Sequence, residues 1–98
     1  MKRDEVLRRL RANGQRLQDF SVRHLAIFGS VARDEAQEGS DIDILVEFEP
    51  GAPVGLFEFV RLQRFLSEIL DSRVDLVTRD ALRPEMRESV LQEAIDAA

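Results

Sequence analysis

The chain has 98 residues, of which 44% are hydrophobic and 34% are charged, and its formal net charge is −5 at pH 7. It contains no cysteine, which excludes disulfides and thiolate metal sites. The acidic balance argues against direct nucleic-acid binding, and no apolar run approaches the roughly 20 residues of a membrane span. We therefore expect a single cytoplasmic domain, 1–98, in which residues 1–19 form a helical N-terminal region and residues 20–98 form the core.

Helical and strand patterns alternate from the start of the chain. Residues 4–13 carry apolar side chains at helical spacing, with Asp4 as a plausible N-cap and Gly14 as a plausible stop. Residues 24–28 are a short apolar run, which indicates a buried strand. Residues 30–37 are predicted to form a short helix directly after a tight turn.

The second half continues the alternation. Residues 41–48 change between polar and apolar at every step, which is typical of a strand with two different faces. The remaining predicted elements are a loop at 49–53, an amphipathic helix at 56–70, a strand at 73–77 and a helix that begins at Pro84 and runs towards Ala97. This order predicts an α/β (α+β) fold, a small sheet backed by helices, and leaves the strand directions open.

Two acids stand in one predicted strand. Asp41 and Asp43 point to the same side, with their backbones about 6–7 Å apart. Aspartate is depleted in strands, and an unpaired carboxylate close to the core costs folding free energy. A hard cation with oxygen ligands would compensate both charges, whereas a solvated outer face would tolerate them without one.

A third acid interrupts the next predicted strand. Asp75 lies between two apolar residues, and it would join Asp41 and Asp43 if the two strands are neighbours. Three carboxylates can hold two Mg²⁺ ions for in-line attack on phosphorus. Glu47 is the rival third ligand, but it lies about 13 Å along the strand from Asp43.

The Gly29-Ser30 pair follows the first strand. Glycine permits a turn that a side chain would block, and a helix that starts there presents free N–H groups to an anion such as a triphosphate. The Ser30 hydroxyl can cap this helix or contact a phosphate. Taken alone, the pair is interpreted as a plain turn and cap.

The spacing of these residues resembles a known signature. Gly29-Ser30, ten intervening residues and Asp41-Ile42-Asp43 match the Gly-Ser-x10-Asp-x-Asp pattern of the DNA polymerase β-like nucleotidyltransferase superfamily. The surrounding segments 28–33, 40–46, 55–57 and 73–78 are similar to its minimal nucleotidyltransferase (MNT) branch. The resemblance extends from about residue 20 to residue 95 and implies a small mixed sheet with helices, as in a reduced polymerase β palm.

The resemblance also implies roles for single residues. Asp41 and Asp43 would hold two Mg²⁺ ions, and Asp75 would bind the metal beside the acceptor hydroxyl and help to deprotonate it. The residues implied to bind ATP are Gly29, Ser30, Arg33 and Ser40. For Arg33, a surface salt bridge to Glu35 or Glu38 is the competing interpretation.

MNT proteins are typically antitoxins that are paired with a HEPN-domain ribonuclease toxin, which they silence by adenylylating a tyrosine. The resemblance therefore implies AMP transfer from ATP to such a partner, with no nucleic acid or membrane as a direct ligand. Two alternatives stay open, namely a small-molecule acceptor and a non-catalytic antitoxin that covers the toxin. The small-molecule enzymes carry an extra helical domain, for which 98 residues leave no room.

One position departs from the family pattern. Asp34 stands where family members commonly have glycine after the Ala-Arg pair. It would repel a triphosphate if it pointed inward, or it is a harmless residue that faces solvent. His24, the only histidine, is interpreted as a partly exposed residue at the start of a strand rather than as a base.

Overall fold

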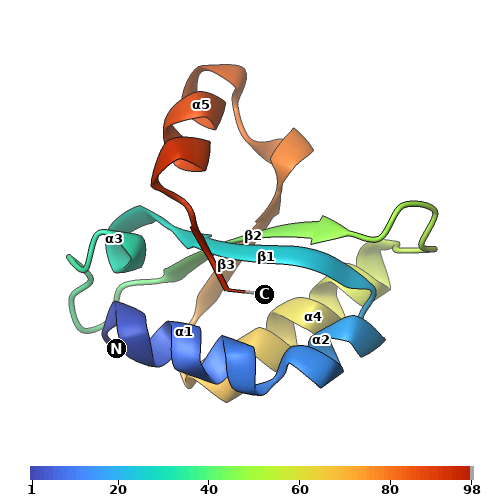
Figure 1. Ribbon diagram of the computed structural model, residues 1–98, viewed down its shortest axis with the longest axis horizontal. Coiled ribbons are helices and arrows are strands. Elements are labelled where there is room, and N and C mark those ends of the chain that lie inside the picture. Colours follow the sequence, from blue (N-terminus) through green and yellow to red (C-terminus); the bar gives the residue numbers. More distant parts are fainter. Residues whose placement is uncertain (98) are drawn as a thin grey trace.

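The computed structural model describes residues 1–97 and contains a four-stranded sheet in the order β3-β2-β1-β4 (Figure 1). The strands are β1 (Val22–Phe28), β2 (Ile42–Phe48), β3 (Val74–Thr78) and β4 (Ile95–Asp96). β1 pairs antiparallel with both β2 and β4, whereas β2 and β3 are parallel. The predicted small mixed sheet is therefore confirmed, and position 98 of the predicted core lies outside the described residues.

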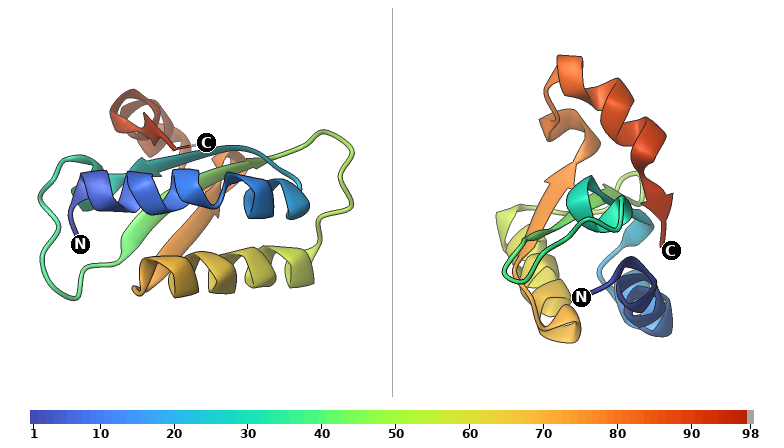
Figure 2. Two further views of the ribbon diagram at one scale, coloured as in Figure 1. Left: turned by 60° about the horizontal axis from the view of Figure 1, so that its bottom comes forward. Right: turned by 90° about the vertical axis from the view of Figure 1, so that its left-hand side faces the viewer.

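Helices cover the two faces of the sheet unequally. They are α1 (Arg3–Ala12), α2 (Gly14–Asp19), α3 (Gly29–Ala32), α4 (Leu56–Leu70), the 3-10 turn η1 (Arg79–Ala81) and α5 (Pro84–Glu93). α1 and α4 lie side by side beneath the sheet, and α5 stands on the opposite face (Figures 1 and 2). No helix within residues 1–97 has both the length and the apolar character to cross a membrane.

The alternating sequence of β2 explains this arrangement. Ile42, Ile44 and Val46 are buried in the main core with α1 and α4. Leu45 points the other way and packs in a smaller cluster with Val90 of α5. Because successive strand residues face opposite sides, Asp43 shares the α5 face with Leu45. The polar positions of β2 therefore lie on the less covered face of the sheet.

Helix α4 makes the crossover that allows β2 and β3 to run parallel. It has the predicted bounds, Leu56–Leu70, and its buried residues recur at helical spacing. At its start, the carboxylate of Glu58 accepts the backbone N–H of Gly55 at 3.1 Å, which satisfies an otherwise free donor. The connection fixes the register that sets Asp43 beside Asp75.

The helix predicted at residues 30–37 is shorter in the structure. α3 ends at Ala32, because Asp34 adopts the left-handed conformation with φ of 59° and breaks the helical path. Its backbone closes instead into a tight turn, in which the N–H of Glu35 donates to the carbonyl of Ser30 at 2.8 Å.

Both terminal regions also differ from the prediction. Gly14 does not end the helical region but begins α2, and Lys2 rather than Asp4 is the N-cap of α1. The last helix ends at Glu93, not near Ala97. The following residues, Ile95–Asp96, pair with β1 and cover its open edge.

Candidate active site

Two of the predicted acids are direct neighbours. Asp43 of β2 is the register partner of Asp75 of β3, and parallel partners in adjacent strands lie about 4.8 Å apart. Each stands two residues before an apolar residue of the α5 face, Leu45 and Val77 respectively. Both side chains therefore project from the same face of the sheet.

Asp41 precedes β2 and forms an ion pair with Arg73, at 3.2 Å between Oδ1 and Nε. Both side chains are largely exposed, so this pair stabilises the fold by at most about 1 kcal/mol. Within residues 1–97, no three acidic or histidine side chains already form a metal cage. A metal at this edge would compete with Arg73 for the carboxylate of Asp41, and the loss of this exposed ion pair would cost little stability.

The electrostatics of Asp43 reflect its surroundings. Burial raises the pKa of its carboxyl, and the nearby charges of Asp75 and Asp41 raise it further. Arg33 acts in the opposite direction without cancelling the shift. The acids thus form a site that lacks enough positive charge of its own.

This raised pKa predicts a pH dependence of the ligand-free protein. Because the folded state binds the Asp43 proton more tightly than the unfolded state does, protonation of Asp43 stabilises the fold. This stabilisation is fully present below the unfolded pKa of about 3.9 and is lost as the pH rises through the higher folded pKa. At pH 7 and without metal, Asp43→Asn should therefore melt at a higher temperature than the native protein. Thermal unfolding in EDTA should show this difference shrinking as the pH falls towards 4, and a constant difference would contradict the assignment.

The turn at Gly29 lies against the same acid. Gly29 has φ of 71°, which favours glycine. A Cβ at this position would overlap Oδ2 of Asp43 and lie 3.0 Å from its Cγ. The backbone of the turn therefore lies so close to the Asp43 carboxylate that no side chain fits between them.

The predicted anion site at this turn needs a correction. α3 has only four residues, so it has almost no helix dipole to offer an anion. The N-cap is Phe28, without a side-chain cap hydrogen bond, so Ser30 does not cap the helix. What the turn can offer to a phosphate is the Ser30 hydroxyl and backbone N–H groups other than that of Gly29, which donates to the carboxylate of Glu93.

A residue that the sequence did not reveal completes the turn. The carboxylate of Glu93, from the end of α5, accepts the backbone N–H of Gly29 at 2.9 Å and two hydrogen bonds from Arg33, at 3.0 and 3.2 Å. Arg33 also donates to Glu35 at 3.1 Å, as one interpretation of the sequence expected. No local pattern marks Glu93, because its partners are 60 and 64 residues away.

The predicted positions Ser40 and Asp34 lie in the loop between α3 and β2. The Ser40 hydroxyl accepts the N–H of Gln37 at 3.1 Å and so holds the loop that leads into β2. Asp34 is exposed, and its carboxylate accepts the backbone N–H of Arg3 at 3.4 Å. Its left-handed conformation explains why glycine suits this position.

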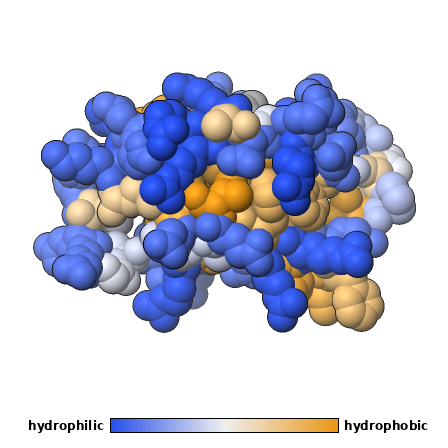
Figure 3. Space-filling view, turned by 90° about the horizontal axis from the view of Figure 1, so that it is seen from below, coloured by the Kyte–Doolittle hydropathy of each residue, from blue (hydrophilic) through white to orange (hydrophobic). Residues whose placement is uncertain are grey.

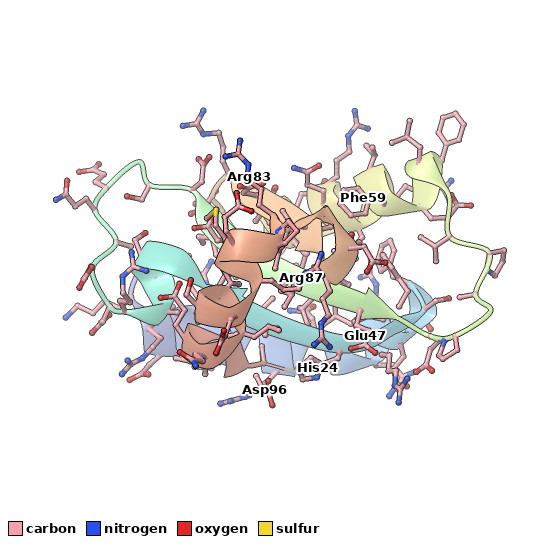
Figure 4. All side chains as sticks on the ribbon, turned by 90° about the horizontal axis from the view of Figure 1, so that it is seen from above. His24, Glu47, Phe59, Arg83, Arg87 and Asp96 are labelled. Atoms are coloured by element: carbon pink, nitrogen blue, oxygen red, sulfur yellow. The ribbon has the colours of Figure 1, made fainter. Side chains whose placement is uncertain are left out.

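Glu47 and His24 lie outside this constellation. Glu47 is near the far end of β2, opposite His24 in the register, and contacts Arg23 at 3.7 Å. His24 lies 2.9 Å from the carboxylate of Asp96 (Figure 4). Glu47 is therefore about 13 Å along β2 from Asp43.

Comparisons with known proteins identify the family. A family model described as a nucleotidyltransferase domain matches residues 5–97. The protein adenylyltransferase MntA of Thermococcus cleftensis is 40% identical over 93 residues, which cover 94% of this chain and 92% of the relative.

Solved structures agree with this assignment. One that is provisionally assigned as a minimal nucleotidyltransferase has a TM-score of 0.82 at 40% identity and covers 97% of this chain and 95% of its own. A chain of the complex between a tri-AMPylated Shewanella oneidensis HEPN toxin and an MNT antitoxin shares the fold, with a TM-score of 0.64 at 21% identity, covering 94% of this chain and 71% of its own. The chain therefore belongs to the nucleotidyltransferase domain family and, like its relatives, is a nucleotide-transferring enzyme.

Proposed function

We propose that this protein is a Mg²⁺-dependent antitoxin that transfers AMP from ATP to a hydroxyl, namely a tyrosine, of a cytoplasmic HEPN ribonuclease toxin. The observation that carries the proposal is the juxtaposition of Asp43, Asp75 and the Gly29 turn at one edge of the sheet. The adenylyltransferase named among the relatives and the AMPylated toxin in the related complex support the choice of donor group and acceptor.

The donor binds on the Gly29 side of the acids in this proposal. The triphosphate is held by Ser30, the backbone of the turn, Ser40 and Arg33. Because Arg33 is paired with Glu93 and Glu35, the phosphates must draw its guanidinium away from these carboxylates or share it with them. A phosphate accepts the planar fork of an arginine well, since it offers several charged oxygens.

The acid cluster fits divalent cations. Its donors are all carboxylate oxygens, which Mg²⁺ prefers. The pKa of Asp43 is raised first by burial and then by the charges of Asp75 and Asp41, and a bound cation would offset both effects. Asp41 and Asp43 would hold both ions, with Asp75 as the third ligand. Bound Mg²⁺ would supply the positive charge that stabilises the phosphoryl oxygens during transfer.

The transfer step follows from this placement. The acceptor oxygen attacks the α-phosphorus and forms a new P–O bond. The bond from the α-phosphorus to the oxygen that bridges to the β-phosphate breaks, and pyrophosphate leaves with that electron pair. Asp75 takes the proton of the hydroxyl, and holding the hydroxyl in line provides much of the rate enhancement.

A test in cells distinguishes AMP transfer from steric neutralisation of the toxin by binding alone. We expect that the double variant Asp41→Asn with Asp43→Asn loses both AMP transfer and protection against the HEPN protein of the same genome. The reason is that both metal-ligand charges are removed while the shape of each side chain is kept. Growth after toxin induction and the intact mass of the purified toxin measure the two effects. Full protection by the double variant without any added AMP would support the steric antitoxin instead.

A further inference from the structure

The strand order places the Gly29 turn and the β3 edge on opposite sides of Asp43. Gly29, at the end of β1, lies on one side of it, and Asp75, on β3, lies on the other. β3 is an edge strand, so the space beyond Asp75 is not filled by a further strand. In-line displacement requires the attacking group to stand opposite the leaving group. If pyrophosphate leaves on the Gly29 side, the acceptor approaches across the β3 edge.

A groove is present on that side. It has a volume of about 750 Å³ and runs between β3 and α4. Its lining residues are Asp41, Val60, Gln63, Arg64, Ser67, Glu68, Arg73, Val74 and Asp75. Gln63 donates its side-chain amide to the carbonyl of Val74 at 2.9 Å, which ties the two walls together. Asp41 and Asp75 line this groove at the β3 edge. Because the Asp75 side chain projects from the α5 face while α4 lies beneath the sheet, an acceptor in the groove reaches the carboxylate around the edge of β3.

The other end of the groove reaches an exposed apolar surface. Leu56, Phe57 and Val60, at the start of α4, are 77%, 85% and 38% exposed. Figure 3 shows apolar atoms at the lower right of the molecule, where α4 begins. Such large exposed side chains cost solvation free energy in an isolated chain and are typical of a docking surface. We call these three residues the α4 patch.

The α4 patch and the groove form one continuous surface, because Val60 belongs to both. Gln63 lies seven positions after Leu56, which is about 10 Å along the helix axis. A partner side chain bound at Leu56 would therefore lie roughly 10 Å along α4 from Gln63. Gln63 is hydrogen-bonded to Val74, which precedes Asp75 in β3.

Resting on the proposed function, we infer that the β3–α4 groove and the α4 patch bind the acceptor segment of the toxin, with an apolar anchor on Phe57 and the hydroxyl at Asp75. The lining favours a protein over a nucleic acid. Arg64 and Arg73 alternate with Glu68 and the two aspartates, so no continuous basic track is present along the groove. A mixed polar wall next to an apolar anchor is the composition of a protein–protein interface.

The test compares two patch variants with a matched control. Phe57→Ser and Val60→Glu alter exposed side chains on α4, whereas Met86→Ser alters a 49% exposed side chain on α5. AMP transfer to the purified HEPN protein of the same genome gives kcat and KM, and calorimetry gives its Kd. The ATP-induced rise in Tm reports the donor site separately. We expect at least a tenfold rise in KM and Kd for both patch variants, with kcat, the ATP response and the Met86→Ser control unchanged.

Each other outcome has a defined meaning. Unchanged KM and Kd in both patch variants would overturn the groove assignment. If the native chain binds Mg²⁺-ATP but transfers no AMP to the toxin, the proposed function fails, and the Kd values still decide where the toxin docks. If light scattering shows that Phe57→Ser converts a dimer into a monomer while toxin binding is unchanged, the α4 patch is a contact between two copies of this chain and the inference is wrong.

Discussion

Asp43→Asn should abolish most of the stabilisation that Mg²⁺-ATP gives to this protein. A ligand at a hundredfold excess over its Kd stabilises the folded state by roughly 2.7 kcal/mol, which raises the Tm of a small domain by on the order of 10 °C. Asp43 is the central acid, between Asp75 and the Gly29 turn, and asparagine removes its charge while keeping its shape. Differential scanning calorimetry with and without Mg²⁺-ATP measures the loss.

AMP transfer by the same variant should fall at least about a hundredfold, because a metal-ligand charge is worth several kcal/mol in the transition state. Glu47→Gln is the matched control, since Glu47 lies on the same strand and face but is not beside the turn. It should keep both the ATP response and the transfer rate. An equal ATP-induced shift in Asp43→Asn would place the nucleotide elsewhere on the chain.

Gly29→Ala should lose nucleotide binding and also destabilise the fold. An alanine at φ of 71° costs about 1–2 kcal/mol of backbone strain. Its Cβ would in addition overlap the carboxylate of Asp43, and forcing an atom into filled space costs about 1–3 kcal/mol more. Urea unfolding gives the total loss, and ATP titration gives the loss of affinity.

Gly51→Ala separates the two contributions. Gly51 has φ of 78°, but a Cβ there would meet nothing within 4 Å. This control should therefore show the backbone cost alone and bind ATP as the native protein does. If Gly29→Ala were no less stable than Gly51→Ala, the close approach between the turn and Asp43 would not exist in solution.

The central elements of the site could be predicted from the sequence because their signals are local. The period of two in residues 41–48 assigned Asp43 to a strand face, and the helical period of residues 56–70 gave α4 with its observed bounds. A helix of that length between two strands also makes them natural parallel neighbours. The sequence left the strand directions open, and only the parallel register of β2 and β3 in the structure sets Asp43 beside Asp75.

What could not be predicted depends on contacts between distant residues. The hydrogen bonds from Gly29 and Arg33 to Glu93 join α3 to the end of α5, and no periodicity encodes them. The pairing of Asp41 with Arg73 likewise arises only when β3 lies beside β2. The length of α3 was misjudged because Asp34 takes a left-handed conformation that a helical residue pattern does not reveal.

AMP transfer to the toxin requires that the bond between the α-phosphorus of ATP and the oxygen bridging to the β-phosphate breaks. Two ATP analogues test it directly, one with an imido bridge between the β- and γ-phosphates and one with a methylene bridge between the α- and β-phosphates. Intact-mass spectrometry of the HEPN protein should show added AMP with ATP and with the imido analogue, and no change with the methylene analogue or in EDTA. Addition of a phosphoryl group instead of AMP, or no change with ATP and Mg²⁺, would contradict the account.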